Sequence, residues 1–170
     1  MTRFEVVSDR SAITIEARSS VGPILWRADG VIGHIEAEIT DGLVDPARHP
    51  TAKLALEVER LSSGNALYDA ELRRRIDARR FPSTTVELRE VAVLGGESRY
   101  QLQGDVVFHG VTRTVRGTVT AELDDDGNMR IHGDQVFDIR DFKIPSPTIL
   151  MLKIFPDVRV RLEIEAQPEG

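Results

Sequence analysis

The chain of 170 residues contains no cysteine. Disulfides, thiolate metal sites and a cysteine nucleophile are therefore excluded. Aromatic residues make up only 5% of the chain, and its formal charge is −6. This acidic balance argues against general binding to nucleic acid, because neutralising phosphates requires net or clustered positive charge.

Several signatures of catalysis are also missing. The chain has no Gly-x-Ser-x-Gly elbow, and Gly30-Val31-Ile32-Gly33 lacks the Lys-Ser/Thr and the flanking helix of a phosphate loop. None of the four histidines is paired at a spacing typical of metal ligands. These are His34, His49, His109 and His132. We therefore predict no enzyme activity, no metal and no cofactor.

Long apolar runs are absent as well. No stretch approaches the ~20 residues that span a bilayer, so no integral membrane segment is expected. The first residues lack the apolar run of a signal peptide, which favours a cytoplasmic protein, or a periplasmic or secreted one if a signal was removed. Only Lys53, Lys143 and Lys153 are lysine among 22 basic residues, a bias that favours a bacterial source.

The clearest positive signal is a period of two between Arg99 and Leu123. Apolar residues share one face on each side of the His109-Gly110 pair, namely Tyr100, Leu102, Val106 and Phe108 before it and Val111, Val115, Val119, Ala121 and Leu123 after it. Such alternation is typical of strands with one buried side. Because glycine tolerates positive φ and histidine visits that region readily, the pair predicts a tight turn between two strands.

The same alternation recurs along the whole chain. It covers residues 13–18, 31–39, 54–59, 86–89, 129–139 and 158–166, and the turns are marked by Asp41-Gly42, Gly95-Gly96 and Asp124–Asn128. Many strands joined by short turns can remove their exposed edges by closing on themselves. The sequence has no repeat and no linker, so it predicts a single all-β domain over residues 1–170. Its expected form is an antiparallel up-and-down barrel of about eight strands.

One segment, Asn65–Arg80, has helical spacing instead. Its apolar residues are spaced four residues apart, and the members of two oppositely charged pairs have the same spacing. These are Tyr68, Leu72 and Ile76, with the pairs Asp69–Arg73 and Glu71–Arg75. Asn65 or Ser63 can cap the start, and Pro82 marks the end. We expect this helix to close one mouth of the barrel and Phe81 to pack against the wall.

Four segments together carry a family resemblance. Gly104–Val115, which reads GDVVFHGVTRTV, resembles the hallmark of the YceI-like family. Phe4–Ser11, Asp69–Pro82 and Val158–Ala166 are similar to other parts of the same family, in the same order. The resemblance implies a lipocalin-like barrel, and some members bind isoprenoid lipids. The chain departs from the family where Lys143 stands in place of an expected glycine.

The inward face of the barrel is the first candidate site. An eight-stranded barrel is either filled by its own side chains or holds one small ligand, and the alternation alone leaves both readings open. The resemblance favours a cavity. The candidate lining residues are Ile15, Trp26, Leu56, Leu88, Leu102, Phe108, Val119 and Leu162.

An arginine cluster is the second candidate site. Arg73, Arg79 and Arg80, together with His109, are candidate contacts for the head group of a lipid, because arginine forks bind phosphate in a bidentate manner. The plainer interpretation is a solvated helix face and a turn histidine. A further apolar stretch around Pro145-Ser146-Pro147 is expected to form a lip of the barrel.

These observations favour a non-catalytic carrier of an isoprenoid-type lipid, either a polyprenyl lipid or a quinone. One rival is a filled barrel that acts as a protein-interaction or stress-related module. The other is an enzyme that uses the same cavity, which a buried carboxylate or histidine inside it would favour. A homodimer is left open.

Overall fold

The computed structural model describes residues 1–94, 98–145, 148–149 and 151–170. The expected Gly95-Gly96 turn and the Ser146-Pro147 part of the expected lip lie outside these residues. The strands are β1 (Thr2–Val6), β2 (Ala12–Ser19), β3 (Gly22–Asp29), β4 (Ile32–Ala37), β5 (Ile39–Thr40), β6 (Leu43–Val44), β7 (Thr51–Glu57), β8 (Ser83–Val93), β9 (Arg99–Phe108), β10 (Val111–Leu123), β11 (Met129–Asp138), β12 (Thr148–Ile149) and β13 (Leu152–Pro168). The helix is α1 (Ala66–Arg75), and 3₁₀ turns form η1 (Ser8–Arg10), η2 (Pro46–Arg48), η3 (Val58–Arg60) and η4 (Ile139–Phe142).

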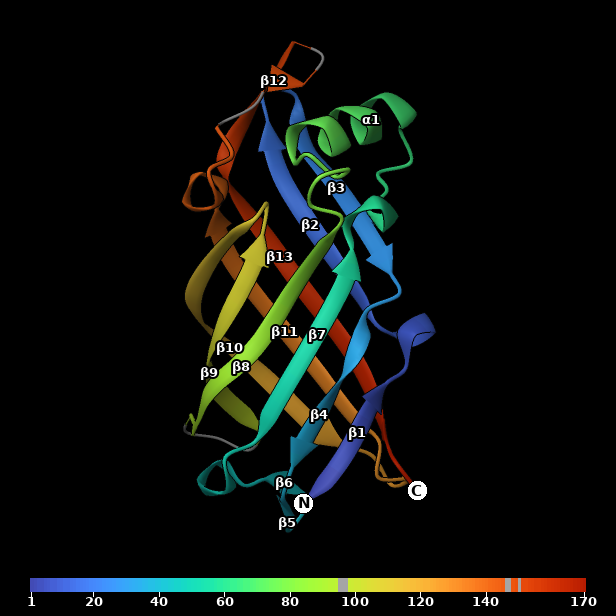
Figure 1. Cartoon of the computed structure of the whole chain (residues 1–170), viewed down its shortest axis with the longest axis vertical. Helices are drawn as coiled ribbons and strands as arrows, with labels where there is room; N and C mark the ends of the chain where they lie inside the picture. The colour runs from blue at the N-terminus through green and yellow to red at the C-terminus, as the bar shows by residue number, and fades with distance from the viewer. Residues whose placement is uncertain (95–97, 146–147, 150) are drawn as a thin grey trace.

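The main sheet is a closed antiparallel barrel (Figure 1). Its order is β1-β4-β7-β8-β9-β10-β11-β13-β2-β3, and β13 pairs with β1 as well as with β2. β1 and β2 are two parts of one long strand interrupted by η1, and β3 and β4 are likewise broken at Gly30, where φ is +99°. Counted this way the barrel has eight strands, which confirms the predicted fold.

The β9–β10 hairpin has the predicted two-residue turn. Phe108 pairs with Val111, and the turn residues His109 and Gly110 have φ of +53° and +70°. A Cβ on Gly110 would lie 2.5 Å from a ring carbon of Phe81, so Phe81 packs directly on the turn. The Phe81 side chain is only half-buried, however, and it does not line either cavity inside the barrel.

α1 begins where the sequence indicated, with the Asn65 side chain accepting from the N–H groups of Leu67 and Tyr68. It ends at Arg75, five residues before the expected end. Asp77 adopts a φ of +51°, and the N–H of Ala78 bonds back to the carbonyl of Arg73, so the chain turns away from the helix axis there. Residues 76–80 therefore form turns, in which Ile76 and Ala78 are buried.

The ion pairs on α1 follow the sequence only in part. The Glu71 carboxylate lies 3.7 Å from Nε of Arg75, as expected, and 2.9 Å from Nη2 of Arg74. Asp69 was expected to pair with Arg73. Instead the Asp69 carboxylate points into the protein and bonds to groups on other segments.

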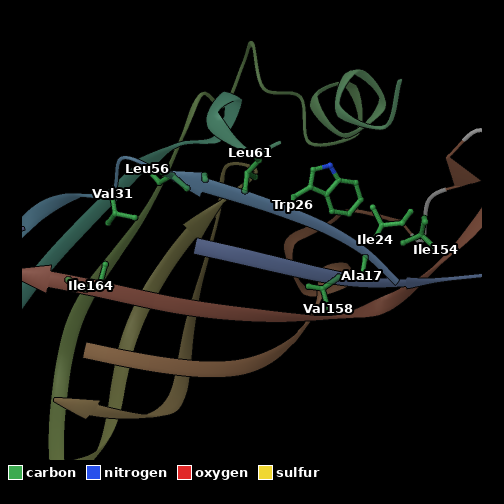
Figure 2. Packing of buried hydrophobic residues seen from close by; sticks show 10 residues of the cluster. Ala17, Ile24, Trp26, Val31, Leu56, Leu61, Ile154, Val158 and Ile164 are labelled. Atoms are coloured by element: carbon green, nitrogen blue, oxygen red, sulfur yellow. The ribbon is translucent and has the colours of Figure 1, made fainter. Parts of the chain in front are cut away.

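The buried apolar residues form three clusters. The first surrounds Trp26 and Val158, and Figure 2 shows the indole of Trp26 projecting from β3 toward α1. The second contains Phe4 and Met129, and the third contains Ile76 and Phe142. Figure 1 shows α1 at one end of the barrel and β5 and β6 at the other. The second cluster lies toward the β5–β6 end, and the third lies at the α1 end.

Candidate functional site

The interior of the barrel holds two cavities of about 210 and 250 Å³. One lies at the α1 end and is bounded by Leu72 and Ile76; we call it the α1 lobe. The other reaches Val44 and Pro50 beside β6; we call it the β6 lobe. Both lobes are lined by Ile13, Leu54, Val86, Val106, Phe137, Val160 and Leu162. The two lobes are therefore halves of one elongated lumen.

The lining is almost wholly apolar. In the α1 lobe the polar lining side chains are Arg75 and Thr84, and the Thr84 hydroxyl donates to the carbonyl of Val107 at 2.8 Å. Among the described lining residues of both lobes there is no histidine and no glutamate. The lumen is thus suited to an apolar chain.

Three glycines widen the β6 lobe: Gly104, Gly117 and Gly133. A Cβ on Gly104 would lie 3.1 Å from the carbonyl oxygen of Glu87, and one on Gly133 would lie 3.1 Å from a methyl of Val119. Sequence reasoning concentrated on large apolar side chains and so missed these positions. Their place in the inward series of β9, β10 and β11 was the available signal.

All eight residues predicted to face inward line the lumen. Ile15, Trp26, Leu56 and Phe108 line the α1 lobe, Leu88, Leu102 and Val119 line the β6 lobe, and Leu162 lines both. Contact of these residues with a ligand remains a prediction.

The candidate head-group residues lie elsewhere. Arg73, Arg79 and Arg80 are exposed and do not line either lobe, and the Arg80 guanidinium stacks 5.0 Å from the centre of the Phe81 ring. Arg75, from the same cluster, does line the α1 lobe. The Nδ1 atom of His109 lies 3.0 Å from the carbonyl oxygen of Phe142. A head-group role for Arg73, Arg79, Arg80 and His109 stays a prediction.

Buried and half-buried residues bound both ends of the lumen. At the α1 end, Ile76, Ala78 and Phe142 are buried. At the β6 end, the backbone N–H of Val44 donates to the Tyr100 hydroxyl at 3.1 Å, which holds the β5–β6 hairpin against β9. Pro50, next to this contact, is also buried.

A buried carboxylate joins α1 to the wall. Asp69 is only 7% exposed, and Oδ1 accepts from the indole N–H of Trp26 at 3.1 Å, the backbone N–H of Ser63 at 2.9 Å and the Ser63 hydroxyl at 2.6 Å. Burial by itself would raise the pKa of Asp69. The hydrogen bonds from Ser63, Ser62 and Trp26 outweigh burial and hold this pKa below its ordinary value.

Asp69 and Glu165 are the two buried acidic residues among the described residues, and neither lines the lumen. In the same part of the chain, no group of three or more His, Asp or Glu side chains could hold a metal ion. No described helix is both long and apolar enough to cross a membrane.

Sequence comparison decides the family. The sequence model of the YceI-like domain matches residues 4–166. The chain belongs to the YceI-like family. None of the curated proteins compared with this YceI-like chain is a significant match.

Solved structures share the fold at low identity. Burkholderia cenocepacia BcnA is 17% identical, with a TM-score of 0.82 over 95% of this chain and 99% of BcnA. A polyisoprenoid binding domain from Saccharophagus degradans, implicated in plant cell wall breakdown, is 12% identical, with a TM-score of 0.80 over 98% of each chain. The Campylobacter jejuni YCEI protein is 16% identical, with a TM-score of 0.64 over 82% of this chain and 81% of its own.

Proposed function

We propose that this YceI-like protein binds a single isoprenoid-type lipid, a polyprenyl lipid or a quinone, and carries it in the barrel without changing it chemically. The observation that carries the proposal is the elongated apolar lumen, with lobes of about 210 and 250 Å³. The Saccharophagus degradans domain of the same fold, described as polyisoprenoid binding, supports the same ligand class.

The shape of the lumen suits a long chain better than a compact ligand. Leu102 lines the β6 lobe and Phe108 lines the α1 lobe, and both lie on β9. At ~3.4 Å per residue these six steps correspond to about 20 Å of wall. An apolar chain gains up to ~0.8 kcal/mol for each CH₂ that it buries, before the cost of ordering the chain is subtracted.

The two rival functions fit the interior less well. A filled barrel would be packed to the density of an ordinary core, which leaves few voids larger than a water molecule. An enzyme would be favoured by a carboxylate or histidine buried in the lumen, and both buried acidic residues of the described chain lie outside it. We further propose that residues 1–170 act as one domain. A bacterial source, a cytoplasmic location and a homodimer stay predictions.

Trp26 provides the test. It is the only tryptophan of the chain, and its indole lines the α1 lobe. Decylubiquinone, a quinone with an apolar tail, should therefore quench the fluorescence of Trp26 in a saturable manner. Duroquinone, which has no tail, is the matched control and should quench only by collision. Mass spectrometry of an organic extract of the purified protein should identify a bound prenyl lipid. Absence of saturable quenching together with an empty extract would contradict the proposal.

A further inference from the structure

The wall of the barrel is hydrogen-bonded unevenly on the two sides of β11. On one side β11 pairs with β13 along its whole length. On the other side it pairs with β10 only as far as Val119 and Gly133. Within the described strands, no pairing joins residues 111–118 of β10 to residues 134–138 of β11. We call this stretch the side window.

Both edges of the side window border the β6 lobe. Successive side chains of a strand point to opposite faces, so Thr118 and Arg116 face outward if Val119 faces inward. Asp134 faces outward for the same reason, next to the inward Gly133. Yet all three outward residues border the β6 lobe. All three are exposed to solvent, and within the described strands no pairing separates this part of the β6 lobe from the outside.

The side window has a frame on all sides. β10 and β11 form its long edges, and the Val119–Gly133 pair closes one end. At the other end, η4 follows β11 directly, and the carbonyl oxygen of Phe142 meets Nδ1 of His109 at 3.0 Å. The Phe142 ring also contacts the ring of Phe108, with centroids 5.9 Å apart. The opening is therefore a built slit in the wall and not a frayed strand end.

The rim of the side window is polar and largely exposed to solvent. Gln135 is half-buried, and its Oε1 lies 3.4 Å from the position of a Cβ on Gly117, so the two residues face each other across the slit. Unpaired strand edges present N–H and C=O groups that water or a polar ligand group can satisfy. Val136, on the outer side, is 50% exposed. Ile76 and Phe142 at the α1 end and Tyr100 at the β6 end are buried, whereas Arg116, Thr118 and Asp134 along the slit are exposed.

We propose that the side window is the entrance of the lumen, and that the ligand passes between β10 and β11 with its apolar tail first. The inference rests on the proposed function, namely that the lumen holds an apolar chain. It also restricts the ligand class, because a slit between two strands admits a single flexible chain more readily than a fused ring system. The rival entrance is the α1 end, near Arg75, and the experiment below separates the two.

The test is a reversible bond across the slit. Gly117→Cys and Gln135→Cys together place two thiols in a chain that has no other cysteine. Gly117 does not have the positive φ that would disfavour a side chain. Stopped-flow quenching of Trp26 by decylubiquinone then reports the rate of loading. We expect the oxidised variant to load at least ~10-fold more slowly than the same protein after reduction, because closing a gate limits the rate.

The matched control is Glu122→Cys with Arg130→Cys, a pair joined by strand pairing in the closed part of the same wall. Its oxidation should leave the loading rate unchanged. Equal rates for the oxidised and reduced forms of the Gly117/Gln135 variant would overturn the side entrance and favour the α1 end. If the parent protein shows no saturable quenching at all, the result contradicts the proposed function rather than the position of the entrance.

A second variant decides the matter if the two thiols do not oxidise. His109→Ala removes the contact with Phe142 that frames one end of the slit. We expect faster loading and faster release of decylubiquinone, measured at a temperature well below unfolding. Unchanged rates would then count against the side window.

Discussion

The indole Nε1 of Trp26 donates a hydrogen bond of 3.1 Å to Oδ1 of Asp69. This bond links the wall of the lumen to the helix that covers its end. β3 is hydrogen-bonded to β2 on one edge, and on its other edge the described residues form one isolated bridge, between Arg27 and Ser62. The Trp26–Asp69 contact therefore closes a part of the wall where strand pairing is sparse.

Removing the Asp69 carboxylate should weaken the fold. Asp69→Ala leaves the N–H groups of Trp26 and Ser63 buried without their acceptor, at a cost of about 1–3 kcal/mol for each unsatisfied group. Urea unfolding should show this loss. The exposed Asp125→Ala is the control and should change the free energy of unfolding by less than ~0.5 kcal/mol. Equal stability of the two variants would refute the structural role of Asp69.

Asp69 should also make stability depend on pH. Its pKa in the folded protein lies below the ordinary value of 3.8. The stabilisation is therefore fully present above the ordinary pKa and is lost as the pH falls through the lowered pKa of the folded state. Between about pH 6 and about pH 2 the parent should lose more stability than Asp69→Asn, which has no carboxylate to protonate. Parallel curves for both proteins would contradict the lowered pKa.

Phe81 offers a test of half-burial. Full burial would make Phe81→Ala cost ~3–5 kcal/mol, but the side chain is only half-buried where it packs on the turn at Gly110, so we expect roughly half of that. Thermal and urea unfolding measure it, with the exposed Leu67→Ala on α1 as control. A loss as large as full burial predicts would mean that Phe81 enters the barrel in solution.

Lys143 is a site where substitution should stabilise the protein. It has a φ of +60° at the end of η4, a conformation that glycine adopts without strain. Lys143→Gly should therefore raise the free energy of unfolding by up to ~1 kcal/mol. Lys153→Gly, in β13, should lower it, since glycine weakens a strand. A fall in stability in both variants would show that Lys143 has contacts that outweigh its strain.

Filling the lumen should separate binding from folding. Leu102 lies opposite Gly117 on the neighbouring strand, which leaves room for a larger side chain beside it. Leu102→Trp should abolish binding of a prenyl lipid while the thermal midpoint stays near that of the parent. In a tightly packed core the same change would cost ~1–3 kcal/mol by overpacking. Leu25→Trp, on the exposed face of β3, is the control for the added indole. Because both variants carry a second tryptophan, binding of the tail-bearing quinone is measured by the absorbance of the ligand.

Strand alternation predicted the fold and the lumen wall well, for a physical reason. A period of two places alternate side chains on one face, and burial of the apolar set fixes which face turns inward, so Leu102 and Val119 were placed inside without knowledge of their neighbours. The side window could not be predicted in this way. The apolar series of β10 is interrupted at Gly117 and Arg113, but β10 is a continuous strand through both, and nothing in the pattern shows where its hydrogen bonds to β11 stop.

The charged residues were predicted less well because their surroundings decide their role. Helical spacing placed Asp69 opposite Arg73, but Trp26 and Ser63 come from distant or irregular segments and offer buried donors that an exposed arginine cannot match. The early end of α1, caused by the left-handed Asp77, carries Arg79 away from the lumen and leaves Arg75 as the arginine of the cluster that lines it.

The residues that bound the two ends of the lumen give the barrel a fixed inner length. Ile76 and Phe142 limit it at one end, and Val44 and Pro50 limit it at the other. A prenyl chain shorter than this length can be enclosed completely, whereas a longer one must leave its last units outside, in water. The barrel then discriminates between lipids by chain length. Its affinity for the lipid should rise with each added isoprene unit until the lumen is full, and should stay constant for longer chains.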